Sequence, residues 1–247
     1  MKIVTWNILS GTPIRSGANL VDAIKAYDAD VLALQEVDHL QPRSAGVESL
    51  EEIAERCGYQ YWIFAPSLFG TPGSFHEPAS NHSSHHSKNE LPTSYGIALL
   101  SRIPITSYEI LSLKKAPIGL PLVVSSPKGQ RIMYVQDEPR MAIAAKLEDG
   151  TTIITAHLSF VPPVNSLQLR KISKWSKKFG DRRIFIGDFN ALIFGKGGLK
   201  SLNPKKSYPG WNPKLKFDFM LSNEIKGEVL DLEYLGVSDH LPLGIRI

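Results

Sequence analysis

The sequence lacks paired cysteines, long apolar runs and clusters of cysteine with histidine. Its single cysteine, Cys57, excludes an internal disulfide framework and favours a reducing compartment, where we expect an inert, buried thiol. No apolar run reaches the roughly 20 residues that a membrane-spanning helix needs, and the N-terminus has no signal-peptide pattern. We therefore expect a soluble, cytoplasmic protein.

Two common kinds of site are also absent from the sequence. No group of cysteines and histidines has the spacing of a zinc site. Gly195, Gly197 and Gly198 do not follow a predicted strand in the way that a glycine-rich phosphate-binding loop requires. A metal or phosphate site must therefore use other side chains.

The composition is that of a globular protein with an uneven charge distribution. Of the 247 residues, 43% are hydrophobic and 21% charged, and no linker-like segment divides them, so we expect one domain over residues 1–247. Residues 170–216 carry 13 Lys and Arg against 2 Asp and Glu. This basic stretch fits a polyanionic partner, either nucleic acid or an anionic lipid surface. The alternative is a solvated face that keeps the protein soluble.

Strand patterns dominate the chain, and only three segments have helical periodicity. The expected strands span residues 2–7, 30–35, 59–64, 95–100, 105–113, 131–135, 141–147, 152–156, 183–186, 217–221, 228–234 and 241–247. The expected helices contain residues 20–27, 47–57 and 169–179. Residues 67–91, rich in Ser, His, Pro, Gly and Asn, predict a long loop. The pattern predicts an α/β fold with two packed sheets and helices on their outer faces.

Polar side chains lie at the ends of apolar strands, where burial in a hydrophobic core would be unfavourable. Four expected strands end in such groups and two begin with them: Asn7, Gln35-Glu36, His157, Asp188 with Asn190, then Asp218 and Asp239-His240. Each alone is typical of a turn or a helix cap. If the last two strands run antiparallel to the first four, all six clusters meet at one edge of the sheet, where α/β proteins bind ligands.

The residue types in these clusters indicate a particular chemistry. Carboxylate and amide oxygens are the ligands that Mg²⁺ prefers, usually with one or two carboxylates and the phosphate of a substrate. An imidazole backed by a carboxylate is the usual general acid or base. The sequence therefore predicts a metal-dependent hydrolase of phosphate esters.

Seven short motifs resemble those of the endonuclease/exonuclease/phosphatase superfamily, in family order and over almost the whole chain. They are Thr5-Trp6-Asn7, Leu34-Gln35-Glu36-Val37, Tyr95-Gly96-Ile97-Ala98 with Leu100-Ser101-Arg102, Thr155-Ala156-His157-Leu158, Gly187-Asp188-Phe189-Asn190, Phe217-Asp218-Phe219 and Ser238-Asp239-His240-Leu241-Pro242. The resemblance implies a DNase I-like fold, a four-layer α/β sandwich with two central mixed sheets.

The resemblance also implies which residues hold the metal ion and the phosphate. Glu36 would be the principal metal carboxylate, with Asn7 and Asp239 near the ion directly or through water. The ion would be Mg²⁺, with Mn²⁺ as the alternative. Tyr95 and Arg140 would contact the phosphate of the substrate.

The remaining implied roles are catalytic. Asp188 and Asn190 would orient the attacking water and the phosphate. His240, paired with Asp218, would act as general base or stabilise the developing charge. His157 would contact the phosphate or protonate the leaving group.

The context of His157 narrows the resemblance. The Ala-His-Leu segment is similar to the DNase I, sphingomyelinase and inositol-phosphatase branches, whereas abasic-site endonucleases carry an Asn-containing segment there. The function expected first is a phosphodiesterase or phosphatase acting on a small or lipid-derived ester. A non-specific nuclease, whose basic stretch tracks the phosphate backbone of DNA or RNA, is the alternative. A more remote alternative is an inactive binding protein on the same fold, against which the complete set of site residues argues.

Overall fold

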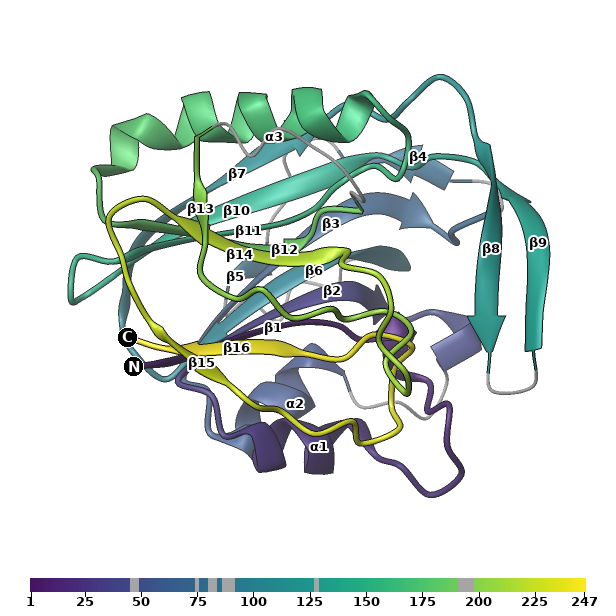
Figure 1. The fold of residues 1–247 in the computed structure, drawn as a ribbon, viewed down its shortest axis with the longest axis horizontal. Helices are drawn as coiled ribbons and strands as arrows, with labels where there is room; N and C mark the ends of the chain where they lie inside the picture. Colours follow the sequence, from purple (N-terminus) through teal and green to yellow (C-terminus); the bar gives the residue numbers. More distant parts are fainter. Residues whose placement is uncertain (45–48, 74–75, 80–83, 86–91, 127–128, 191–197) are drawn as a thin grey trace.

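Two β-sheets face each other in the computed structural model, and helices cover the outer face of each sheet (Figure 1). The structure describes residues 1–44, 49–73, 76–79, 84–85, 92–126, 129–190 and 198–247. Within these ranges, no helix is both long enough and apolar enough to cross a membrane. The four layers, helix, sheet, sheet and helix, confirm the predicted α/β sandwich.

The first sheet contains the N-terminal half of the chain and its C-terminal strands. Its strands, in spatial order, are β15 (Glu228–Leu230), β16 (Leu243–Arg246), β1 (Lys2–Asn7), β2 (Val31–His39), β6 (Ser94–Ser101), β3 (Tyr61–Gly70) and β4 (His76–Pro78), with β5 (Ser84–His85) paired to β3. β1 and β2 are parallel, whereas β16 runs antiparallel to β1. The sheet is therefore mixed, as predicted.

The second sheet is built from the middle of the chain. Its spatial order is β13 (Lys200–Ser201), β14 (Asp218–Ser222), β12 (Arg183–Asp188), β11 (Thr152–His157), β10 (Arg140–Leu147) and β7 (Ile105–Leu113). β11 and β12 are parallel, and β14 is antiparallel to β12. A separate hairpin, β8 (Leu120–Ser126) with β9 (Gly129–Val135), lies between β7 and β10 in the chain.

Three α-helices and three short 3-10 helices complete the described elements. They are α1 (Leu20–Tyr27), α2 (Leu50–Cys57), α3 (Val164–Trp175), η1 (Leu9–Gly11), η2 (Pro42–Ser44) and η3 (Ser176–Phe179). α2 begins with a capping box between Ser49 and Glu52 and ends at Gly58 in the left-handed conformation, as its sequence indicates.

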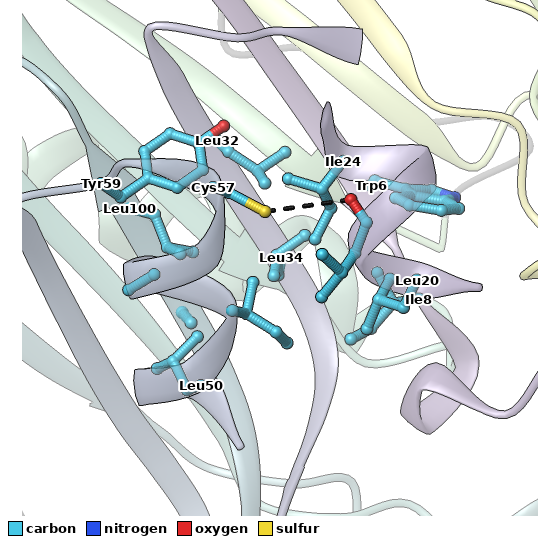
Figure 2. Close-up of a cluster of buried hydrophobic side chains, with 14 of the residues drawn as sticks. Trp6, Ile8, Leu20, Ile24, Leu32, Leu34, Leu50, Cys57, Tyr59 and Leu100 are labelled. Carbon is cyan, nitrogen blue, oxygen red and sulfur yellow. Dashed lines mark hydrogen bonds between the residues drawn. The ribbon is translucent and has the colours of Figure 1, made fainter. Parts of the chain in front are cut away.

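Strand alternation explains the layers. Successive side chains of a strand point to opposite faces, so Val4 and Trp6 of β1 pack with α1 and α2 while Ile3 packs between the sheets. Cys57 lies in the first of these clusters, where its Sγ donates to the carbonyl of Val21 (Figure 2). The cysteine is buried, as expected. On the other side of the molecule, α3 packs on the second sheet through Leu169 and Ile172.

Two expectations about loops and strands were wrong in part. β3 continues to Gly70, and β4 and β5 also lie within the predicted loop 67–91, whose remaining central residues lie outside the described ranges. The expected strand 131–135 is real, but its partner β8 has no counterpart in the prediction. Pro121 obscures the strand pattern of β8, because proline is excluded from central strands and tolerated in exposed hairpins.

Candidate active site

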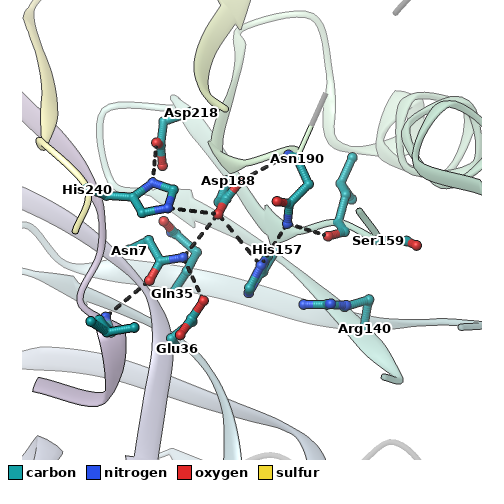
Figure 3. A network of polar contacts seen from close by, with 12 residues as sticks. Asn7, Gln35, Glu36, Arg140, His157, Ser159, Asp188, Asn190, Asp218 and His240 are labelled. Carbon is teal, nitrogen blue, oxygen red and sulfur yellow. Dashed lines mark hydrogen bonds and ion pairs between the residues drawn. The ribbon is translucent and has the colours of Figure 1, made fainter. Parts of the chain in front are cut away.

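The predicted polar clusters do converge, but at the facing ends of two sheets rather than at one edge of a single sheet (Figure 3). Parallel pairing of β1 with β2 places Asn7 beside Gln35 in the first sheet, and parallel pairing of β11 with β12 places His157 beside Asp188 in the second. Asp218 pairs directly with Asp188 across the antiparallel β12–β14 pair. The prediction that all clusters lie at one edge of a single sheet was wrong, because polar residues at strand ends have the same sequence pattern in both sheets.

An irregularity in β2 positions Glu36. The register of β2 against β6 shifts between Gln35 and Val37, and Glu36 has a φ of 57°. A bulge of this kind re-aims a side chain and is common beside active sites. The neighbouring Gln35 is fully buried, and its amide lies 3.2 Å from the Thr5 hydroxyl and 3.5 Å from the Thr155 hydroxyl. Gln35 thus connects the two sheets, while Glu36 is turned into the site.

Asn7 joins carboxylates from both sheets. Its Nδ2 donates to Glu36 Oε1 at 2.9 Å and to Asp188 Oδ2 at 3.0 Å. Its Oδ1 accepts from the backbone N–H of Leu9 at 3.1 Å. The amide group of Asn7 therefore faces the two carboxylates, and its oxygen faces the backbone.

Three carboxyl groups of the site have raised pKa values. Burial, followed by the charge of Asp239, raises the pKa of Glu36 to about 7. Burial and the charge of Asp218 raise the pKa of Asp188 to about 6. Burial also raises the pKa of Asp239. Mutually repelling oxygen ligands of this type fit a divalent cation such as Mg²⁺, which would neutralise them.

His240 and Asp218 form the predicted hydrogen-bonded pair. The distance from His240 Nδ1 to Asp218 Oδ2 is 2.7 Å, and both side chains are buried. Burial alone would lower the pKa of His240, but the charges of Asp218 and Asp188 raise it well above its usual value. The imidazole is therefore charged at neutral pH. Among the described residues, Asp218 Oδ1 has no hydrogen-bond partner.

Asp188, Asp218 and His240 also have the proximity of a metal-binding group, since one ligand atom of each lies within 4.8 Å of the others. A doubly protonated imidazole has no lone pair for a metal ion. The pairing of His240 with Asp218 therefore favours an acid–base or electrostatic function for this group.

His157 and Asn190 form a second pair. Asn190 Nδ2 lies 3.0 Å from His157 Nε2 and also donates to the carbonyl of Leu158. Burial, followed by the charge of Arg140, lowers the pKa of His157 well below its usual value. An amide nitrogen can only donate, so Nε2 of His157 accepts and its proton is on Nδ1. His157 is thus neutral.

The expected phosphate contacts lie next to the His157 side of the site. Arg140 begins β10 and is buried, with Nη2 3.3 Å from Asp137 Oδ1, and its Nε has no partner among the described residues. Tyr95 of β6 is also buried, beneath the guanidinium of Arg43 at 5.5 Å from the ring centroid. Asp38 holds Arg43 through two hydrogen bonds of 2.7 and 2.8 Å.

Sequence reasoning missed Arg43 and Asp137 as residues of this region. Asp137 is buried and accepts from the Ser159 hydroxyl at 2.7 Å and from the Ala116 N–H at 2.6 Å. The only sequence signal for Asp137 was its position just before an apolar strand. Arg43 lies in η2, just after β2.

Comparison with known proteins identifies the family of the chain. A sequence profile of the Endonuclease/Exonuclease/phosphatase family matches residues 4–240. The chain belongs to this family. A search of curated proteins found no match.

Solved structures share the fold at low sequence identity. A family protein from Beutenbergia cavernae is 18% identical with a TM-score of 0.61, over 99% of this chain and 70% of that one. ANGEL2, described as a 2',3'-cyclic phosphatase, is 15% identical with a TM-score of 0.58, over 99% and 93%. D. rerio TDP2, in complex with a single-strand DNA product, is 14% identical with a TM-score of 0.54, over 99% and 97%.

Proposed function

We propose that the protein hydrolyses phosphate esters, with Mg²⁺ or alternatively Mn²⁺ held by Glu36 and Asp239. The observation that carries this proposal is the convergence of carboxyl groups with raised pKa values beside a charged His240–Asp218 pair. Membership of the endonuclease/exonuclease/phosphatase family supports it. A bound cation would supply positive charge that stabilises the charge developing on the phosphoryl group.

Asp188 is the proposed general base. Its pKa of about 6 leaves it ionised at neutral pH, so it can accept a proton from the attacking water. Asn7 donates to its Oδ2, and the backbone N–H of Asn190 donates to its Oδ1 at 2.9 Å, so the carboxylate is fixed in orientation. The water oxygen then forms a bond to phosphorus while the bond from phosphorus to the ester oxygen breaks, and that oxygen leaves with the bonding electron pair.

His240 is the proposed stabiliser of the transition state rather than the base. Because its ring is already charged, it has no lone pair to accept a proton, whereas both ring N–H groups donate. The Nδ1–H group donates to Asp218, whereas Nε2 lies 3.9 Å from Asp188 Oδ2 and is directed into the site. Such a pre-oriented donor lowers the barrier most where negative charge develops.

His157, Arg140 and Tyr95 are the proposed phosphate contacts. A neutral His157 cannot give up a proton readily at neutral pH, so we assign it to phosphate binding through its Nδ1–H rather than to protonation of the leaving group. Arg140 would add a buried positive charge, and Tyr95 a hydroxyl group. Asn7 is then a bridge between Glu36 and Asp188, and it reaches the cation only indirectly.

A small or lipid-derived phosphodiester is the substrate class that the surface favours over nucleic acid. Several Lys side chains of the basic stretch already have partners within the protein and are less available to a phosphate backbone. Lys178 lies 2.5 Å from Glu109, Lys205 lies 2.5 Å from Asp231, and Lys216 donates to the Asn203 carbonyl. A nuclease remains the second candidate, because the similar structure of D. rerio TDP2 is described in complex with a single-strand DNA product.

The test is hydrolysis of a chromogenic phosphodiester, plasmid DNA, RNA, sphingomyelin and inositol phosphates, with Mg²⁺ and with excess chelator. We expect turnover only with the cation, and a loss of about 10²-fold or more in Glu36→Gln. Glu55→Gln, which removes an exposed carboxylate from α2, is the matched control. Full activity in excess chelator would contradict the assignment of the metal ion.

A further inference from the structure

One face of the hairpin β8–β9 is apolar over two successive cross-strand pairs near its base. In its antiparallel register Val123 lies opposite Ile132, and Pro121 lies opposite Tyr134. Because side chains alternate along a strand, these four share one face. Ile118, another exposed apolar residue, lies just before β8.

This face is open to solvent. The exposed fractions are 54% for Val123, 75% for Ile132, 62% for Tyr134 and 55% for Ile118. Among the described residues, the hairpin pairs with neither large sheet. An isolated two-stranded hairpin is marginally stable in water, and a contiguous exposed apolar patch usually marks an interaction surface.

The base of the hairpin is joined to the candidate active site. Leu113 and Arg140 pair across β7 and β10, so the hairpin leaves and re-enters the second sheet beside Arg140. The buried Asp137 holds this base, since it accepts from the Ala116 N–H and pairs with Arg140. Figure 1 shows the hairpin at the end of the molecule opposite both termini, which is the end where β1 and its site residue Asn7 finish.

The charge of the segment selects the kind of partner. Residues 114–136 contain four basic residues and no acidic one. Of these, Lys114, Lys115 and Arg131 are exposed in the structure. Exposed apolar side chains with Lys and Arg nearby in the chain, and an exposed Tyr, match the interfacial region of an anionic bilayer, where acyl chains, head groups and negative charge meet.

We propose that the apolar face of the β8–β9 hairpin docks on an anionic lipid surface and brings the active site to that surface. The hairpin inserts Val123, Ile132 and Tyr134 among the lipids, and the basic residues around it contact the head groups. Because Asp137 ties the base of the hairpin to Arg140, docking places the candidate site next to the interface. Docking of this kind is independent of the proposed chemistry.

Vesicle sedimentation tests this docking directly. Wild-type protein should bind vesicles of equal parts phosphatidylcholine and phosphatidylglycerol, and should bind less to phosphatidylcholine alone or in high salt. Val123→Thr/Ile132→Thr keeps β-branched side chains and leaves Tyr134, whose hydroxyl accepts from the Gly119 N–H. The loss of apolar area should weaken binding by about tenfold or more.

Leu167→Gln is the matched control, because Leu167 is a similarly exposed apolar residue on α3. It should bind vesicles like wild type. Hydrolysis of a soluble chromogenic ester should be equal in all three proteins, so a failure of the proposed chemistry is seen separately from a failure of docking. Absence of wild-type binding, or equal binding by the double variant, would overturn the proposal. A dimer in wild type that the double variant loses would also overturn it, in favour of a second copy as the partner.

Discussion

Glu36→Gln should stabilise the metal-free protein at alkaline pH. The pKa of Glu36 is about 7, against an ordinary value of 4.5. A carboxyl group whose pKa is raised on folding contributes stability that is complete below the unfolded pKa and is lost as pH rises through the folded pKa. At pH 8 the ionised group therefore opposes folding, by about 3 kcal/mol if the whole shift counts.

The expected gain is smaller than this limit, because Glu36 is partly exposed and solvent screens its charge. We expect about 1–3 kcal/mol at pH 8, or an increase in Tm of about 2–10 °C. The replacement keeps the hydrogen bond from Asn7, since a Gln oxygen can accept from Nδ2 as Oε1 does. At pH 5 the difference should fall below about 1 kcal/mol, because most of the ionisation is then absent.

Thermal unfolding in excess chelator, at pH 8 and pH 5, measures this effect. Glu55→Gln on the exposed side of α2 should change stability by less than about 0.5 kcal/mol at either pH. Saturating Mg²⁺ should then reverse the order, because about 100-fold excess over Kd stabilises wild type by about 2.7 kcal/mol and the variant by less. A variant less stable than wild type at pH 8 in chelator would refute the electrostatic reasoning.

Two further changes test the site and the basic stretch. Asp218→Asn should lower kcat by about 10²–10⁴-fold. The variant should also lose more Tm at pH 6 than at pH 9, because the raised pKa of His240 stabilises the wild type only until the pH passes that pKa. An equal loss of Tm at both pH values would contradict the pairing. Lys177→Glu/Lys206→Glu reverses two exposed cations; if they contact DNA, the variant should have a higher KM for DNA and a shallower dependence of that KM on salt, while turnover of a small ester is spared. Unchanged DNA hydrolysis would exclude a polyanion contact there.

The layers and the residues of the site could be predicted from sequence for a simple physical reason. Strand alternation and helical periodicity report burial, and polar groups at the ends of apolar strands report a site. The pattern around Leu20 and Ile24 gave α1, and Asp188 after an apolar strand gave a site residue, because each depends on neighbours in the chain. Whether two strand ends belong to one sheet depends on distant pairing, which no local pattern contains.

The bulge at Glu36 could not be predicted from the local sequence. The Leu-Gln-Glu-Val segment is an ordinary strand pattern, yet Glu36 has a φ of 57° and Asn190 has a φ of 48°. Non-glycine residues in this region cost about 1–3 kcal/mol each, and the carboxylates of the site repel one another as well. Both costs are offset by the core between the sheets, where Ile3, Ile143 and Ile184 are fully buried. Neither cost has a local sequence signal, so the strain and the repulsion at this strand end could not be predicted from the sequence. A bound cation would remove the repulsion between the carboxylates but not the backbone strain.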